Sequence, residues 1–479
     1  MLILMLMLAA LDQTVVATAL PSIAADLAGA TGAARLSWVF SAYLMAATVA
    51  VPMYGKLADL HGTRPVLLVA VGLFLAGSVL CGISPTMDAL VLSRGLQGAG
   101  GGGLLTLAMT AVVRHYPPAS RGKLQGLLGA VYGLSTMVGP LVGGFLVQHL
   151  SWRWAFFINL PAGLLAMGVL SLCFPKPAAA RRGAMDHPGA LLLAAALVCV
   201  LLGTRHAEAP LAAAAAAAGA AVDAAAGAAA AAAAGAAMAS AAKPWPAAWF
   251  LAAGGVLVAA FTAVQARSAH PLLPLSLFGR PGFAAAVGLS MASGFSLLAV
   301  VVYLPQYFQT VRGLSPSSSG LHLMPLMAGI TLGSMACGRW LQRTGQVRQV
   351  ALAGCAITAL AFGALGGVVW APGLPLALVS ACLLPLGLGI GALFPLVTVV
   401  VQGAAPLALL GIATASPVMF RSVAGAVGVA LLATVFARAG GAALVFWLAG
   451  GATLLAALAA RSMPVVMAAP TTPQRPAAG

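Results

Sequence analysis

A carboxylate stands inside an apolar run near the start of the chain. Residues 4–21 read LMLMLAALDQTVVATALP, and Asp12 interrupts a segment otherwise suited to a lipid bilayer. A charge near the centre of a membrane helix costs at least about 2.5–3.5 kcal/mol, so an acid there is functional by default. An isolated carboxylate in hydrocarbon favours its neutral form, which is what a proton carrier requires. The residues therefore predict proton coupling at Asp12; the alternative is an acid that only bonds a neighbouring helix.

Arg94 is the expected partner of this acid. Counted from the same membrane face at 1.5 Å per residue, Asp12 would lie about 15 Å deep and Arg94 about 10 Å deep. An arginine side chain can bridge that difference. Glycines follow at 95, 98 and 100–103, so the alternative is an arginine that binds backbone carbonyls where two helices cross closely.

The composition indicates a membrane protein. Of 479 residues, 62% are hydrophobic and 6% are charged, with a mean hydropathy of +1.05; an ordinary soluble domain has about 25% charged residues. The net charge of +16 does not indicate nucleic-acid binding, because the basic residues lie in short turns between apolar runs. The six cysteines occur singly, without a CxxC pair, which predicts small buried side chains and no metal site.

Apolar segments long enough to span a bilayer follow one another along the chain. They predict an all-α polytopic membrane protein with about 14 transmembrane helices, at residues 1–24, 36–57, 66–84, 88–113, 124–147, 154–174, 189–204, 247–265, 282–309, 319–341, 349–370, 374–402, 407–436 and 442–460. Lys and Arg concentrate in alternate loops, which places both termini in the cytoplasm.

One Ala-rich run interrupts this pattern. If residues 211–242 crossed the membrane, the second half would invert and its arginines would move outside, against the charge bias. We therefore expect a low-complexity external insert there. The predicted organisation is a six-helix bundle at 1–174, a linker with two transmembrane helices at 175–270, a second six-helix bundle at 271–462 and a cytoplasmic tail at 463–479.

A short motif follows the second segment of each six-helix set. GKLADLHGTR begins at Gly55 and GRWLQRTGQVR at Gly338, with the same spacing between their glycines. Repeated halves are typical of transporters, whose substrate path lies between them. In the first motif Asp59 can meet a basic side chain or a helix N-terminus across the gap between the halves. We expect gating from Gly55, Asp59, Gly62 and Arg64; the alternative is simple anchoring by positive charge.

The fifth segment carries closely spaced small residues and a proline. Gly139 and Gly143 form a small-xxx-small pair, and Pro140 can bend the helix. Together with Gly144 they predict a smooth, bendable face that serves conformational change. Close helix packing is the alternative reading.

Four motifs in order carry a family resemblance. They are LDQTVVATALP, GKLADLHGTRP, RGLQGAGGGG and GLSTMVGPLVGG, supported by SWRWAFFINLP and MFRSVAGAVG. With them the sequence resembles the major facilitator superfamily, and within it the fourteen-span drug–proton antiporter branch, along nearly the whole chain. The resemblance implies a major-facilitator-type fold of two six-helix bundles plus a two-helix linker. It also implicates Asp12, Arg94 and Gln97 in proton coupling and associates the glycine–proline motif with exporters.

These observations predict a proton-coupled secondary active exporter of small lipophilic or amphiphilic compounds, a multidrug efflux protein of the kind that gives antibiotic resistance. It would lie in the bacterial cytoplasmic (inner) membrane, draw on the proton gradient without a cofactor, bind no nucleic acid and act as a monomer, with a periplasmic adaptor left open. A dedicated exporter of a metabolite, lipid or siderophore and a non-transporting sensor are the alternatives. An enzyme is not expected, because GAGGGG at 98–103 lacks the Lys-Ser/Thr of a phosphate loop.

Candidate substrate contacts are few. Polar, aromatic or soft side chains in apolar segments suit a cavity wall; they are Tyr43, Met137, Gln306, Tyr307 and Gln309. For each residue taken singly, simple packing is the favoured alternative. Because Asp12 is the only deep acid, we expect neutral or monocationic amphiphiles rather than dications.

Overall fold

The structure, a computed structural model, describes residues 2–27, 33–174, 185–204, 247–314, 316–371, 373–436 and 441–465. Every regular element within these ranges is a helix. The predicted Ala-rich insert at 211–242, the tail beyond residue 465 and the side chains of Met137 and Pro140 lie outside the described residues.

The first half of the chain forms one helical bundle. Its helices are α1 (Leu2–Leu27), α2 (Ala33–His61), α3 (Thr63–Gly82), α4 (Met87–His115), α5 (Pro118–His149), α6 (Trp154–Phe157) and α7 (Asn159–Cys173). The short α6 leads directly into α7, so the two together occupy the sixth predicted span.

The second half repeats this plan after a linker. The linker contributes helices His187–Thr204 and α10 (Ala247–Arg267). The second bundle contains α11 (Phe283–Thr310), α12 (Pro316–Leu321), α13 (Met324–Thr344), α14 (Val347–Trp370), α15 (Leu376–Ala404), α16 (Leu410–Phe436) and α17 (Gly441–Ala460).

The predicted fold class is confirmed. Among the described residues, 13 helices are long and apolar enough to cross a membrane, and α5, with 32 residues, lies beside them. Each predicted apolar segment corresponds to a helix or to a short helix continued by a long one. The long spans are apolar on most sides, as expected for helices that face lipid on one side and other helices on the other.

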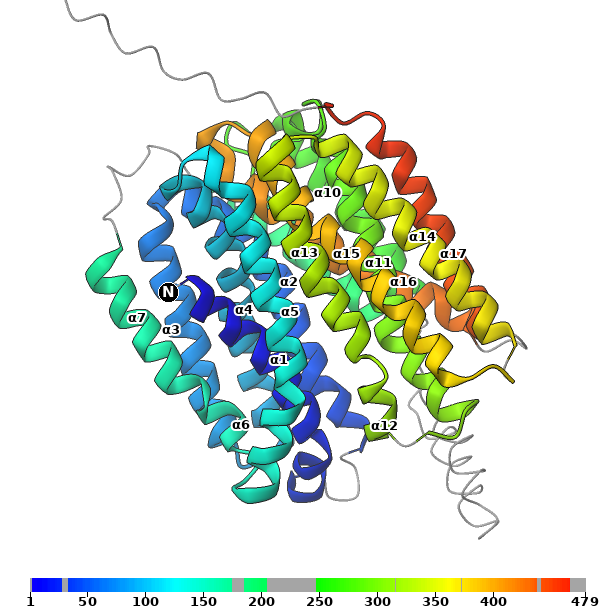
Figure 1. The fold of residues 1–479 in the computed structure, drawn as a ribbon. Helices are drawn as coiled ribbons and strands as arrows, with labels where there is room; N and C mark the ends of the chain where they lie inside the picture. The colour runs from blue at the N-terminus through cyan, green and yellow to red at the C-terminus, as the bar shows by residue number, and fades with distance from the viewer. Residues whose placement is uncertain are drawn as a thin grey trace, which may run out of the picture.

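The two halves lie side by side and pack crosswise. Figure 1 shows the first bundle in blue to cyan and the second in green to red. Helix α2 packs on α16, and α5 packs on α13. The second helix of each half therefore meets the fifth spanning helix of the other, which is the arrangement expected for two repeats related by an axis along the membrane normal.

The two predicted glycine motifs form matching turns. Gly62 precedes α3 with φ of 86°, and Gly345 ends α13 with φ of 65°. A residue with a side chain rarely adopts this backbone conformation. The shared spacing in the sequence thus reflects the same turn after the second spanning helix of each half.

Candidate functional site

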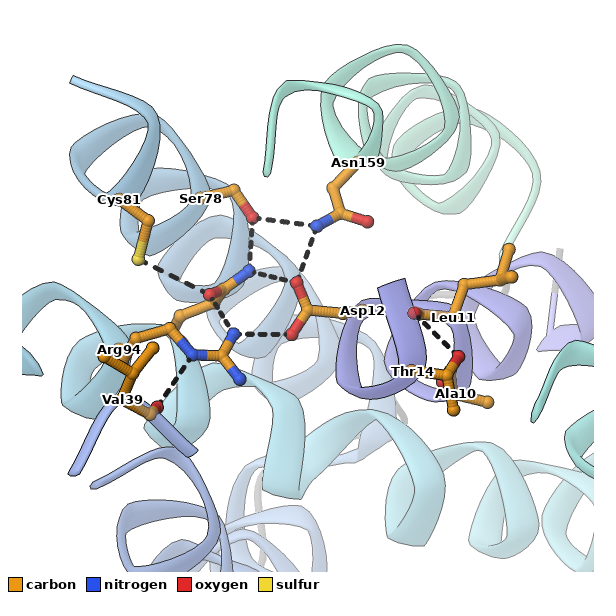
Figure 2. Close-up of polar contacts among 10 residues, drawn as sticks. Ala10, Leu11, Asp12, Thr14, Val39, Ser78, Cys81, Arg94 and Asn159 are labelled. Carbon is orange, nitrogen blue, oxygen red and sulfur yellow. Dashed lines mark hydrogen bonds and ion pairs between the residues drawn. The ribbon is translucent and has the colours of Figure 1, made fainter. Parts of the chain in front are cut away.

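Asp12 lies at the centre of a buried polar network inside the first bundle (Figure 2). Its Oδ2 accepts a hydrogen bond from Arg94 Nη1 at 2.7 Å. Its Oδ1 accepts from Gln97 Nε2 at 2.7 Å and from Asn159 Nδ2 at 2.8 Å. None of these four residues is more than 1% exposed. The carboxylate thus has three N–H donors and one full countercharge, in a place that bulk water does not reach.

Arg94 is held from several sides. Its Nε donates to the carbonyl of Val39 at 3.2 Å, and its guanidinium lies 4.3 Å from the centre of the Tyr43 ring. Within the described part of the chain, its Nη2 has no hydrogen-bond partner. Both readings of the sequence therefore apply, because the arginine pairs with the acid and also binds a backbone carbonyl.

Gln97 connects the ion pair to α3. Its Oε1 accepts from Arg94 Nη1 at 2.6 Å and from Cys81 Sγ at 3.6 Å, and its Nε2 also donates to Ser78 Oγ at 2.7 Å. Hydrogen bonds to charged groups contribute about 1.5–3 kcal/mol each. A change in the charge of Asp12 would therefore be felt by side chains on α3, α4 and α7 at once.

The glycines of α4 allow the helices to approach closely enough for this network. A Cβ on Gly98 would lie 2.3 Å from the carbonyl oxygen of Tyr43, and one on Gly102 would lie 2.3 Å from that of Ala47. Only residues without a side chain permit such backbone contact. The same contact between α2 and α4 brings Val39 and Tyr43 against Arg94.

A second polar cluster joins the two halves at the end of α2. Asp59 Oδ1 accepts from the backbone N–H of Gly411 at 2.7 Å, and Oδ2 accepts from that of Ile412 at 3.0 Å. These groups belong to the N-terminal turn of α16, where a helix favours negative charge. Arg114 of α4 also donates to Asp59 Oδ1, at 2.6 Å. One carboxylate therefore holds a basic side chain of its own half and the helix N-terminus of the other.

Comparison with known proteins is consistent with this geometry. Residues 2–202 match the family model described as Major Facilitator Superfamily. The fold is similar to that of the proton:xylose symporter XylE bound to 6-bromo-6-deoxy-D-glucose, with a TM-score of 0.67 over 95% of this chain and 93% of that one, at 16% identity. The first part of the chain, residues 2–202, thus matches the major facilitator superfamily, and the chain as a whole has a similar fold.

Relatives of the chain include proteins named as transporters or as multidrug resistance proteins. An MFS-type transporter of Mycobacterium tuberculosis is 35% identical over 434 residues, 90% of this chain and 58% of that protein. Multidrug resistance protein 3 of Bacillus subtilis is 31% identical over 70% of this chain and 60% of its own length. The multidrug transporter protein MdtP of the same bacterium is 29% identical over 92% and 75%. The chain thus spans less than two thirds of the first two relatives, and all three are described as transporters or resistance proteins rather than enzymes.

The other predicted gating residues lie close to the contact at Asp59. A Cβ on Gly55 would lie 2.8 Å from the carbonyl oxygen of Gly411, so this glycine lets α2 and α16 touch. Gly62 forms the turn into α3. Arg64, in contrast, donates to the carbonyl of Ser171 on α7, within its own half. The basic side chain that binds Asp59 is Arg114. Arg114 lies on α4, outside the GKLADLHGTR motif, so the motif did not identify it.

The small residues of α5 serve two different contacts. Gly139 and Gly143 face α1, where added Cβ atoms would lie 1.7 and 2.1 Å from the hydroxyls of Thr14 and Thr18. Gly144 has open space around it. Gly133, which precedes Gly139 on the same helix, faces Thr331 of α13 in the other half. At Gly139 and Gly143 the small-residue face therefore packs on α1 inside the first bundle, and its role in conformational change stays a prediction.

The predicted cavity residues do not converge. Tyr43 is 1% exposed and belongs to the Asp12 network, where its ring lies over Arg94. Tyr307 is also 1% exposed and packs in the core of the second bundle. Gln309 is exposed and donates to Ser319, while the buried Oε1 of Gln306 has no partner in the described part of the chain. Tyr43 and Tyr307 are packed side chains in this arrangement of the halves, and the assignment of these residues to a cavity wall stays a prediction.

Asn159 and Ser78 are site residues that the sequence analysis missed. Asn159 begins α7 inside the SWRWAFFINLP motif, and Ser78 lies in the apolar α3. An amide in a segment that spans a membrane needs a buried partner. That requirement is the signal that would have linked Asn159 to Asp12.

Proposed function

We propose that the protein is a transporter of the major facilitator superfamily and, within it, a proton-coupled exporter of small lipophilic or amphiphilic compounds, of the fourteen-span drug–proton antiporter type. The observation that carries the proposal is the buried network in which Asp12 accepts from Arg94, Gln97 and Asn159. A membrane carboxylate with an adjustable set of partners is suited to bind and release a proton. The names of the two Bacillus subtilis relatives, a multidrug resistance protein and a multidrug transporter, support drugs as the substrates.

Protonation of Asp12 has a direct consequence for Arg94. Removal of one charge of a buried ion pair costs about 3–5 kcal/mol, because the other charge remains uncompensated. The guanidinium can then rely on the carbonyl of Val39, the Oε1 of Gln97 and the ring of Tyr43. We propose that this imbalance shifts α1 against α4 and couples the proton to the movement of the halves.

Release of the contact at Asp59 would accompany that movement. The bonds from Asp59 to Gly411 and Ile412 cross between the halves, so they exist only while this end of the protein is closed. The pair with Arg114 lies within one half and can persist. Asp59 therefore acts in the proposal as a latch whose partners differ between the two states.

The proton gradient is a sufficient energy source. One elementary charge that moves through 100 mV is worth about 2.3 kcal/mol, or about fiftyfold in the attainable concentration gradient. No cofactor is required in this scheme. The protein would act as a monomer in the bacterial cytoplasmic membrane with both termini inside; an adaptor partner is not needed for export across that membrane.

Dye efflux under an imposed pH gradient tests the proposal. Asp12→Asn should abolish gradient-driven efflux from cells and the corresponding uptake into inverted vesicles, while Asp26→Asn on the same helix should retain both, since Asp26 pairs with Arg153 outside the network. The double variant Asp12→Asn with Arg94→Gln removes both charges of the pair, so the buried arginine is not left without a countercharge. It thus separates loss of the proton carrier from misfolding caused by an uncompensated charge. Efflux by the double variant at the parent's rate would remove Asp12 from the mechanism.

A further inference from the structure

Arg421 lies between the halves, and among the described residues it forms no ion pair with a carboxylate. Arg421 belongs to α16 and lines a small central cavity together with Met109 of α4, Ser290 of α11 and Thr398 of α15. The cavity is therefore formed by both bundles. Among the described residues that line this cavity, Arg421 is the only charged one.

The carboxylates of the described chain are engaged elsewhere. Asp12 pairs with Arg94, Asp26 with Arg153 and Asp59 with Arg114. Asp186 accepts from Gln265 and from the backbone of Gly189 in the linker, and Asp88 is in the first turn of α4. Within the described ranges no carboxylate therefore forms an ion pair with Arg421. A positive charge at this depth is costly without a counterion.

The surroundings of Arg421 fit an amphiphile rather than a bare ion. Its guanidinium lies 4.6 Å from the centre of the Phe394 ring, and Tyr132 of α5 is within electrostatic range on the opposite half. Both Arg421 and Phe394 are half-buried. Leu393, Val397 and Val418 complete an apolar wall. One cation beside aromatic and aliphatic side chains matches a ligand with an anionic group on an apolar body.

Helix packing fixes where this charge points. A Cβ on Gly294 of α11 would lie 2.2 Å from the carbonyl oxygen of Arg421 and 2.7 Å from its Cγ. The hydroxyl of Ser290 donates to the carbonyl of Pro417, one turn before Arg421, at 2.7 Å. These contacts hold α16 against α11 and fix the start of the arginine side chain beside the cavity.

We propose that Arg421 is a substrate-binding residue and that the protein exports anionic amphiphiles, such as aromatic carboxylates, in preference to neutral or cationic ones. This inference names the substrate class of the proposed exporter and so rests on that function. It replaces the expectation of neutral or monocationic substrates, which considered the deep acid but not the deep base. The cavity is small in this closed arrangement, so the ligand enters when the halves separate around it.

A matched probe series tests the inference without a proton gradient. 1-Pyrenebutyrate, its amide and the corresponding trimethylammonium compound share one aromatic body and differ in charge. Fluorescence titration of the full-length protein in nanodiscs, corrected with empty nanodiscs, should show the anion binding about tenfold or more tighter than the amide, as a charged hydrogen bond predicts. The cation should bind no better than the amide.

Variants assign the preference to Arg421. Arg421→Met should reduce the anion–amide ratio to within about twofold, Arg421→Lys should retain most of it, and Arg343→Gln, at an exposed position, should leave it unchanged. Equal binding of anion and amide to the parent protein would overturn the inference, as would a preference that survives Arg421→Met. If Arg421→Met fails to fold, the anion–amide ratio of the parent protein and of Arg421→Lys still tests the inference.

Two further experiments distinguish a site for amphiphiles from a site for inorganic anions, and substrate binding from transport. If chloride or sulfate displaced 1-pyrenebutyrate at equal concentration, the site would be one for inorganic anions, and the amphiphile class would be wrong. In proteoliposomes, export of a monoanion against one proton moves two charges per cycle, so 100 mV should raise the attainable gradient by the square of the fiftyfold factor for a neutral substrate. Anion-selective binding without proton-driven export would contradict the proposed function but leave the binding site standing.

Discussion

Asp59→Asn is expected to open the end of the protein at which α2 meets α16. The carboxylate accepts from the backbone N–H groups of Gly411 and Ile412 at 2.7 and 3.0 Å. An asparagine retains one acceptor oxygen, and its amide N–H₂ would face the second N–H donor. Its neutral side chain also loses the favourable interaction with the N-terminus of α16.

The size of the effect follows from these contacts. Loss of one charged hydrogen bond costs about 1.5–3 kcal/mol, and the helix N-terminus contributes about 0.3–1 kcal/mol more. The bond from Arg114 lies within one half, so it stabilises both states and cancels. A net change of about 2–4 kcal/mol shifts the ratio of closed to open protein about 30- to 900-fold.

Thiol labelling measures this shift. Thr414 is 2% exposed and lies in the wall of the cavity between the halves, so Thr414→Cys in a background without the native cysteines is labelled only when this end opens. Asp59→Asn should raise the maleimide labelling rate about 30- to 900-fold. Asp26→Asn removes an ion pair within one half and should change the rate less than twofold. Labelling of the Asp59→Asn variant within threefold of its parent would refute the latch.

Three other changes give defined outcomes. Gly98→Ala should destabilise the protein by about 1–3 kcal/mol, because the added methyl group would contact the backbone of Tyr43. Gly95→Ala on the same helix meets open space and should stabilise the protein by about 0.5–1 kcal/mol. Thermal unfolding of the two variants in detergent measures the difference. Asn159→Ala removes one of three donors to Asp12 and should slow gradient-driven efflux about tenfold, while a change in stability alone would leave the rate per folded molecule unaltered. Hydrogen bonds from Trp152, and then from Arg153, lower the pKa of Asp26 below its ordinary value of 3.8. Its contribution to stability should therefore be present above that pH and be lost as the pH falls below it, so the melting temperatures of parent and Asp26→Asn should converge in acid.

Much of this organisation could be predicted because membrane helices leave strong signals. Length and hydropathy define the spans, and the glycine spacing after the second span of each half anticipated the turns at Gly62 and Gly345. The pair of Asp12 and Arg94 could be proposed because two charges in apolar segments need one another. These inferences depend on local sequence and on the cost of burying charge.

The remaining features depend on which helix faces meet. The sequence does not show that Gly139 faces α1 while Gly133 faces α13, because both lie on one helix with small residues on several sides. Tyr43 suits a cavity wall by residue type, yet its position over Arg94 is set by the close approach of α2 to α4. Arg421 was likewise visible as a basic residue, but its separation from every described carboxylate emerges only from the packing of both halves.

Substrate-driven proton movement tests the central claim most directly. The full-length protein would be reconstituted with a pH-sensitive dye inside the vesicles, and a gradient of 1-pyrenebutyrate would be imposed without an initial pH difference. The parent should move protons against the substrate flux, and Asp12→Asn should exchange labelled for unlabelled substrate while it moves no protons. Proton movement by Asp12→Asn at the parent's rate would contradict the assignment of Asp12 as the proton carrier.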